Sequence, residues 1–253
     1  MRESFNERTN ERTNERTNER TIAWNSFINA DCMEYMKDIP DDYFDLAIVD
    51  PVYGDVTGGG YTTSKWDGKK HHIGNCVADE KAYHRSIWNQ EKTGKEYFKE
   101  LFRVSKNQII WGGNFFVEYL PSSQGWMVWD KKRPAGVSFS DCELAFTSFN
   151  VGLRIFRYRW NGMLQEDMKN KEYRIHPTQK PVALYKWLLH NFAKPGDKIL
   201  DTHVGSASSL IACKQLGFDY IGFEIDPEYY KQACERIKRE TAQMTMFDMG
   251  WME

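Results

Sequence analysis

The sequence lacks long hydrophobic runs, paired cysteines and a large net charge of either sign. No stretch of about 18 apolar residues occurs, so we expect no transmembrane helix. The N-terminus has no apolar signal-peptide core, so we expect a cytoplasmic protein. The cysteine count is odd and no Cys-x-x-Cys pair occurs, which argues against a disulfide framework or a zinc cage and predicts reduced thiols. The cysteines are Cys32, Cys76, Cys142, Cys213 and Cys234.

The formal net charge is only −2, so composition alone does not favour a polyanionic partner. A nucleic-acid-binding protein still needs only a local basic face, because one groove contacts the phosphates. Such local clusters occur at Lys131-Lys132-Arg133 and at Arg154, Arg157 and Arg159. Taken one at a time, we interpret these clusters as solvated surface.

The N-terminal segment is a repeat. Residues 6–21 are four copies of Asn-Glu-Arg-Thr. They carry no apolar face at helical or strand spacing, so residues 1–21 are expected to form a disordered tail. The hydrophobic residues, 41% of the chain, suffice for a single α/β domain over residues 22–253.

Strand and helix patterns alternate along this domain, which predicts a mostly parallel, doubly wound α/β sheet of Rossmann-like type. Buried strands are expected where short apolar runs end at turn residues, and helices where apolar residues recur at helical spacing. The expected strands are 45–50, 108–111, 126–129, 143–149, 153–158, 198–201 and 219–224, and the expected helices are 96–104, 180–192, 208–216 and 227–240. Gly217 is expected to end the third helix, and Pro181 to lie in the first turn of the second.

A long segment without periodicity follows the first of these strands. Residues 54–75 are rich in Gly, Lys, Thr and His, which is typical of a functional or mobile loop. His71 and His72 with Cys76 offer too few ligands for a metal ion, so we expect none there.

One turn has the features of a nucleotide-binding site. Asp201 ends a strand, Gly205 allows a tight turn before a helix, and Glu224 ends the next strand. A carboxylate at that position binds ribose hydroxyls in nucleotide-binding α/β folds. An NAD site would have the same spacing, but the Gly-x-Gly-x-x-Gly signature is absent.

A second acid also follows a buried strand, in Asp50-Pro51-Val52-Tyr53. By itself this tetrapeptide is equally typical of a simple turn, since Asp and Pro are common turn residues.

Together these segments resemble a known family. Asp50-Pro-Val-Tyr53 resembles the D-P-P-Y motif of amino-group DNA methyltransferases, and Asp201 to Ser209 resembles their D-P-F-x-G-S-G-T-T cofactor motif. His176-Pro-Thr-Gln-Lys-Pro181 resembles their H-P-T-x-K-P segment, and Asn29-Ala-Asp31 their N/G-D segment. The catalytic motif precedes the cofactor motif, as in the circularly permuted β class. The resemblance spans residues 29 to about 240.

The resemblance implies S-adenosylmethionine as cofactor, DNA as partner and specific roles for individual residues. Asp50, Pro51 and Tyr53 would be catalytic. Asp31 would contact the cofactor adenine, Thr178 and Lys180 its methionine carboxylate, and Glu224 its ribose. The cofactor turn would be formed by Asp201, His203, Gly205 and Ser206.

The implied reaction is methylation of N6 of an extruded adenine. The amino lone pair is delocalised into the ring, so it needs acceptors for its N–H bonds, which Asp50 and the Pro51 carbonyl would supply while Tyr53 stacks on the base. In the family, Asp rather than Ser as the first motif residue favours adenine. The alternatives are an N4-cytosine methyltransferase, a catalytically weak DNA-binding relative, and a methyltransferase of protein glutamine or RNA.

Two residues depart from the family motifs. Val52 replaces the second proline of D-P-P-Y, which removes rigidity from that loop. Ala207 replaces the second glycine of the cofactor turn, where a methyl group would crowd the ligand or disfavour a positive φ.

The remaining expectations concern the target. Residues 54–92 and 150–175 are candidate DNA-contacting insertions, and their short length suggests a homodimer or a short site. Trp111-Gly-Gly-Asn114 resembles a segment lining the target pocket, at most one of Trp126 and Trp129 faces the site, and Phe146 is expected in the core. A solitary enzyme of phage or restriction–modification origin fits this organisation.

Overall fold

A computed structural model describes residues 23–54, 92–133, 140–161 and 164–248. The expected N-terminal tail, the metal-ligand candidates of the 54–75 segment and most of the 54–92 insertion therefore lie outside the described residues. Within the described part, none of the helices has the length and apolar character needed to cross a membrane.

The described strands form an eight-stranded sheet in the order β1-β10-β9-β2-β3-β5-β4-β6. The first five strands in this order are parallel, β5 is antiparallel to β3 and β4, and β6 is parallel to β4. The strands are β1 (Ser26–Asn29), β2 (Leu46–Val49), β3 (Gln108–Trp111), β4 (Trp126–Asp130), β5 (Cys142–Thr147), β6 (Arg154–Arg157), β9 (Lys198–Asp201) and β10 (Asp219–Glu224). A separate two-stranded sheet pairs β7 (Trp160–Asn161) with β8 (Leu164–Gln165).

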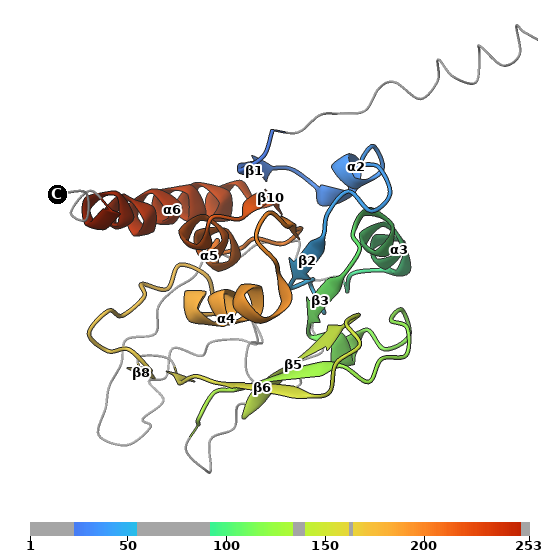
Figure 1. Cartoon of the computed structure of the whole chain (residues 1–253), viewed down its shortest axis with the longest axis horizontal. Helices are drawn as coiled ribbons and strands as arrows, with labels where there is room; N and C mark the ends of the chain where they lie inside the picture. The colour runs from blue at the N-terminus through green and yellow to red at the C-terminus, as the bar shows by residue number, and fades with distance from the viewer. Residues whose placement is uncertain (1–22, 55–91, 134–139, 162–163, 249–253) are drawn as a thin grey trace, which may run out of the picture.

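Helices cover both faces of the large sheet (Figure 1). One face is covered by α4 (Val182–Phe192), α5 (Ser208–Leu216) and α6 (Pro227–Asp248), and the other by α2 (Cys32–Met36) and α3 (Lys95–Val104). A short 3₁₀ helix, η2 (Gly113–Phe115), follows β3. The predicted fold class, a mostly parallel doubly wound α/β sheet, is confirmed.

The central strand β2 shows why the sequence gives this architecture. All four of its residues are buried, as expected for a parallel strand with helices on both faces. Leu46 and Ile48 lie in the hydrophobic cluster under α4 and α5, while Ala47 and Val49 lie in the cluster under α2 and α3. This alternation fixes the register of β2, because a shift by one residue would exchange the two sets.

Most predicted elements are confirmed, with differences at their ends. The helix after Lys180 begins at Val182, and Pro181 is its N-cap with extended backbone rather than a first-turn residue. A residue before proline is disfavoured from helical geometry, so Lys180 stays outside the helix. The last helix continues to Asp248 instead of ending at 240. Gly217 ends α5 with φ +74°, as predicted. The elements β1, α2, η2, β7 and β8 were not predicted.

Candidate active site

Acidic residues gather at one edge of the sheet because four parallel strands end there. Asp31 follows β1, Asp50 follows β2, and Asp201 and Glu224 end β9 and β10. The chain leaves β2 through α3 toward β3, and leaves β9 through α5 toward β10, in opposite directions along the sheet. The adjacent carboxyl ends of β2 and β9 therefore form a topological switch point, where open α/β sheets bind their ligands.

Asp50 has one occupied and one open carboxylate oxygen. The Lys180 ammonium donates to Oδ2 and forms an ion pair with it. Oδ1 is buried and has no hydrogen-bond partner among the described residues. Burial raises the pKa of Asp50 and the nearby Lys180 opposes that rise. A buried acceptor without a donor is uncommon in folded proteins, and it marks a position where a ligand N–H can bind.

Tyr53 lies beside Asp50 on a small aromatic platform. Its ring stacks on Phe115 of η2, with 4.9 Å between centroids and 20° between planes. Gly112 makes room for it, since a Cβ built on Gly112 would lie 2.7 Å from the Tyr53 ring. Gly112 also has φ +66°, a conformation that favours glycine. The Gly112-Gly113 pair thus places both rings, and the segment predicted to line the target pocket lies against Tyr53.

Glu224 organises the turn between β9 and α5. Its Oε2 accepts from the Gly205 N–H at 2.8 Å, and its Oε1 accepts from the Asp226 N–H at 2.9 Å. Burial raises its pKa, and these two backbone donors oppose the rise. A carboxylate oxygen can accept further hydrogen bonds, so Glu224 can hold the turn and still bind a hydroxyl.

Asp201 is directed into its own loop. Its Oδ1 accepts from the His203 N–H at 2.9 Å, and its Oδ2 accepts from the Ser209 hydroxyl. Burial raises its pKa to about 7, against the effect of these two donors. The side chain is 2% exposed and does not line the cavity at this edge.

Ala207 adopts the glycine-like conformation that its motif position requires, with φ +63° as the N-cap of α5. Its side chain is fully buried and belongs to the hydrophobic cluster under α4 and α5. It does not line the cavity next to Asp31 and His203. The methyl group is thus accommodated by the core, at a cost in backbone strain.

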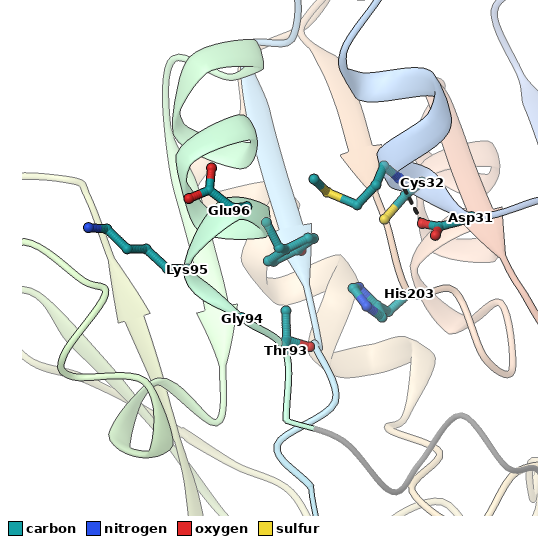
Figure 2. Close-up of a pocket in the computed structure, with 9 residues that line it drawn as sticks. Asp31, Cys32, Thr93, Gly94, Lys95, Glu96 and His203 are labelled. Atoms are coloured by element: carbon teal, nitrogen blue, oxygen red, sulfur yellow. Dashed lines mark hydrogen bonds between the residues drawn. The ribbon is translucent and has the colours of Figure 1, made fainter.

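A cavity of about 380 Å³ opens beside these acids, within the size range of ligand sites (Figure 2). Asp31 and Cys32 from the start of α2 form one wall, residues 93–97 entering α3 form another, and His203 lies between them. Asp31 also caps α2, because its Oδ1 accepts from the Met33 N–H at 2.9 Å. Of the predicted cofactor residues, Asp31 and His203 line this cavity.

His203 is held by a short chain of hydroxyl groups. Its Nδ1 lies 2.9 Å from the Thr202 hydroxyl, which lies 2.5 Å from the Tyr97 hydroxyl. Burial lowers the pKa of His203 to about 4, although Asp31 opposes this. The imidazole is therefore neutral near pH 7, and it would not repel a cationic ligand in the cavity.

The remaining predicted cofactor residues lie around the turn. The Thr178 hydroxyl lies 3.0 Å from Nδ1 of His176, whose ring lies under Gly205. Ser206 is buried, and its carbonyl accepts from Arg236 at 2.7 Å. Lys180 was predicted near a methionine carboxylate, but its ammonium contacts Asp50 and also Glu143, at 3.2 Å.

Glu143 and Lys131 are two charged residues that sequence reasoning did not assign to this site. Glu143 on β5 pairs with both Lys180 and Lys131. Lys131 is 8% exposed, so the interpretation of its cluster as solvated surface is wrong for this residue, while the neighbouring Lys132 is exposed. No local signal distinguishes them, because Lys131 lies in the charged run from Asp130 to Arg133 and Glu143 follows two residues after Asp141. Phe146, in contrast, is fully buried in the core as predicted.

The described residues define a structural class. A doubly wound sheet with a carboxylate at each of four neighbouring strand ends, and a cavity at their switch point, is the arrangement of Rossmann-like proteins that bind nucleotide-type cofactors. Within the described residues, no group of three or more acidic, histidine or cysteine side chains could hold a metal ion.

Known sequences similar to this chain are DNA methyltransferases. Residues 122–235 match the N6_N4_Mtase family model, described as DNA methylase. The chain is 42% identical over 71 residues to the type II methyltransferase M.HpaI of Haemophilus parainfluenzae, covering 28% of this chain and 23% of that protein. It is 29% identical over 160 residues to the type II methyltransferase M2.DpnII of Streptococcus pneumoniae, covering 61% and 59%. The matches thus span less than two thirds of either relative.

The chain also resembles solved structures of DNA methyltransferases. The PvuII DNA methyltransferase, described as cytosine-N4-specific, aligns with a TM-score of 0.53 at 12% identity, over 88% of this chain and 93% of that one. The M1.HpyAVI complex with S-adenosylmethionine aligns at 0.49 and 20% identity, over 83% and 98%. At these identities the PvuII likeness shows a shared fold. The family match begins at residue 122, just before β4, so Asp50 and Tyr53 lie outside it.

Proposed function

We propose that this protein is a DNA methyltransferase that transfers a methyl group from S-adenosylmethionine to an exocyclic amino group, N6 of adenine. The observation that carries the proposal is the open Oδ1 of Asp50, a buried acceptor at the switch point beside the stacked ring of Tyr53. The DNA methylase match over residues 122–235 and the two type II methyltransferase relatives support it.

The residues at the end of β2 suit the chemistry of an amino nucleophile. One amino N–H donates to Oδ1 of Asp50 and the other to the carbonyl of Pro51, which favours a pyramidal nitrogen with an available lone pair. When bound, the cofactor would supply an electrophilic methyl group to this nitrogen and would depart as a neutral thioether. The nitrogen then loses its proton to Asp50 or to water. Tyr53 stacks on the target base with the ring face opposite Phe115.

The cavity suits the cofactor, which supplies an electrophilic methyl group when bound. Asp31 would accept from the adenine amino group, and Glu224 from ribose hydroxyls next to the Gly205 turn. Neutral His203 lies where a cation can approach, while Thr178 and Ser206 border the turn from the side of α4 and α5. Asp201 would act by holding the turn, through His203 and Ser209.

DNA contact is proposed for residues 54–92 and 150–175, the two candidate insertions. The described part of the second segment contains the edge strand β6 with exposed Arg154 and Arg157. Basic side chains at an edge strand suit phosphate contacts. Analytical ultracentrifugation with and without DNA tests the accompanying dimer hypothesis, which a strict monomer acting on a long site would contradict.

N4-cytosine is the second candidate, because it is also an exocyclic amino group and the PvuII enzyme is described as cytosine-N4-specific. Adenine is preferred on the family resemblance, since an Asp stands first in the catalytic motif. To test the assignment, the protein is incubated with tritiated cofactor and unmethylated DNA, which is then digested to nucleosides. Label on N6-methyladenine is expected. Label on N4-methylcytosine would overturn the base assignment, and unlabelled DNA would overturn the function.

A further inference from the structure

Four charged side chains of alternating sign form a continuous row that ends at the open oxygen of Asp50. The charge row consists of Lys131, Glu143, Lys180 and Asp50, in that order. Its members come from four separate parts of the fold: the ends of β4 and β2, the start of β5 and the residue pair before α4. The tertiary structure thus brings together four segments that are far apart in the sequence.

The two lysines of the row lie over aromatic side chains. Lys180 is 2% exposed at its side chain, and its Nζ lies 5.6 Å from the centroid of the Trp111 ring. The Nζ of Lys131 lies 5.1 Å from the Trp129 ring, and the two indoles contact each other edge-on at 6.4 Å. Low-polarity walls strengthen charge–charge interactions, and an unpaired charge there would be costly.

Glu143 is the central member of the row. Burial disfavours its charged form, but Lys180 and Lys131 outweigh burial and lower its pKa to about 2. The pKa of Lys180 is raised well above its usual value, because Asp50 and Glu143 outweigh the opposite effect of burial. Glu143 and Lys180 are therefore both charged near pH 7.

The row determines which oxygen of Asp50 is available. A lysine ammonium has several donors and a flexible stem, so it does not choose between two carboxylate oxygens unless a second partner fixes it. Glu143 is that partner for Lys180, and only Oδ2 of Asp50 is bonded. The other groups whose charges interact with Asp50 or Lys180 are Lys131, Tyr53, Tyr97, His176, Tyr185 and Asp201. None of these donates to Oδ1 among the described hydrogen bonds.

We propose that Glu143 is a positioning residue for methyl transfer: it holds the Lys180 ammonium on Oδ2 of Asp50, which leaves Oδ1 directed at the target amino group. This rests on the proposed function, because the amino group is the donor that Oδ1 would meet. Glu143 itself touches neither substrate nor cofactor.

The test compares Glu143→Gln with Lys180→Met. The amide introduced by Glu143→Gln still accepts from Lys180, but a negative charge near Asp50 is lost, so the pKa of Asp50 falls. Removing the Lys180 charge raises it. The acidic limb of the single-turnover rate against pH is therefore expected to move to lower pH in Glu143→Gln and to higher pH in Lys180→Met. The rate on the plateau falls roughly tenfold and roughly a hundredfold, respectively.

Lys106→Met is the matched control. Lys106 pairs with Asp45 at 2.7 Å, at the opposite end of β2, and it is outside the proposed site. This variant is expected to keep the wild-type profile. Limbs that move in the same direction in Glu143→Gln and Lys180→Met, or a Glu143→Gln profile like that of Lys106→Met, would overturn the proposal.

A readout independent of activity separates this inference from the proposed function. In protein labelled with ¹³C at the aspartate carboxyl carbons, the signal lost in Asp50→Asn identifies Asp50, and its pH titration is followed by NMR. Opposite displacements of that titration in Glu143→Gln and Lys180→Met support the charge row even if the wild type methylates no DNA. An unmoved Asp50 titration overturns the charge row even if the wild type is active.

Discussion

Asp50 and Asp201 lie at the carboxyl ends of neighbouring parallel strands, yet their environments differ. Leu46 of β2 pairs with Ile199 of β9. Asp50 directly follows β2, and Asp201 is the last residue of β9. Asp50 faces a lysine from a distant segment and keeps one oxygen open. Asp201 has both oxygens bonded by its own loop. Two acids of one type at one edge thus differ in what they can do: Asp50 can accept from a ligand, whereas Asp201 holds the loop that shapes the cofactor turn.

The largest expected effect follows from altering Asp50. We expect Asp50→Asn to lower the rate of methyl transfer roughly a thousandfold, because a charged acceptor for the amino group is lost. The variant also leaves Lys180 with Glu143 as its one anionic partner, so the free energy of unfolding should fall by about 3 kcal/mol. The double variant Asp50→Asn/Lys180→Met should regain stability in chemical denaturation but not activity. Recovery of activity in that double variant would contradict the role of Asp50.

Altering Glu224 should affect cofactor binding instead. Glu224→Gln can offer only one acceptor oxygen, so it must give up either the Gly205 or the Asp226 N–H. We expect the dissociation constant of S-adenosylmethionine to rise roughly tenfold, measured by calorimetry. Asp219→Asn, at the other end of β10, is the control and should bind like the wild type. Equal affinities of Glu224→Gln and the control would reject the ribose role.

The aromatic platform next to Asp50 depends on Gly112. Gly112→Ala introduces a Cβ 2.7 Å from the Tyr53 ring at φ +66°, so the ring must move. We expect the transfer rate to fall roughly tenfold through misplacement of the base-stacking ring. Gly217→Ala is the matched control, because its φ is +74° and nothing lies within 4 Å of its Cβ. Both variants should lose about 1 kcal/mol of stability from the backbone, so an equal loss of activity in both would show that Tyr53 is not the cause.

The pH dependence of stability should distinguish Asp201 from an ordinary paired acid. Its pKa is raised from 3.8 to about 7 in the folded protein, mainly by burial, so only the unfolded chain ionises between these values. The stability of the wild type relative to Asp201→Asn should therefore fall as pH rises from about 4 to about 7.

For Asp45 we expect the opposite change of stability with pH. Burial favours its neutral form, but Lys106 and the Lys198 N–H outweigh burial and lower its pKa. Relative to Asp45→Asn, the wild type should gain stability as pH rises toward 3.8 and hold that gain above it. Chemical denaturation of the wild type and of each variant, from below pH 3.8 to about pH 7, measures both stability differences. Parallel slopes for the two aspartates would contradict the difference between their environments.

The smallest effect is expected at Ala207. Replacing it with glycine relieves a positive φ, worth about 1–2 kcal/mol, and loses a buried methyl group and unfolded-state rigidity of similar total value. The free energy of unfolding of Ala207→Gly should stay within about 1 kcal/mol of the wild type. Cofactor affinity should not change, because Ala207 does not line the cavity. A large gain in affinity would show that the methyl group does reach the ligand.

Local patterns in the sequence were sufficient to predict most strands of the sheet and the longer helices. Continuous apolar runs such as 46–49 and capping residues such as Gly217 act within a few residues, so they can be recognised without a structure. The short elements β1 and α2 carry too few periodic residues to be predicted. Asp50, Asp201 and Glu224 were found for the same local reason, whereas Asp31 was assigned through the family resemblance. The charge partners of Asp50 were not found, because the pairing of Lys180 with Asp50 and with Glu143 joins residues far apart in the chain.

Asp50 is assigned to activation of the amino group and Glu224 to cofactor binding. The most direct test of these separate roles is a single-turnover methyl transfer to DNA at saturating S-adenosylmethionine. Under this condition a binding defect is compensated, whereas a defect in activating the amino group is not. We predict that Glu224→Gln transfers label to adenine at close to the wild-type rate, while Asp50→Asn transfers it roughly a thousandfold more slowly. Equal rates for the two variants would contradict the account.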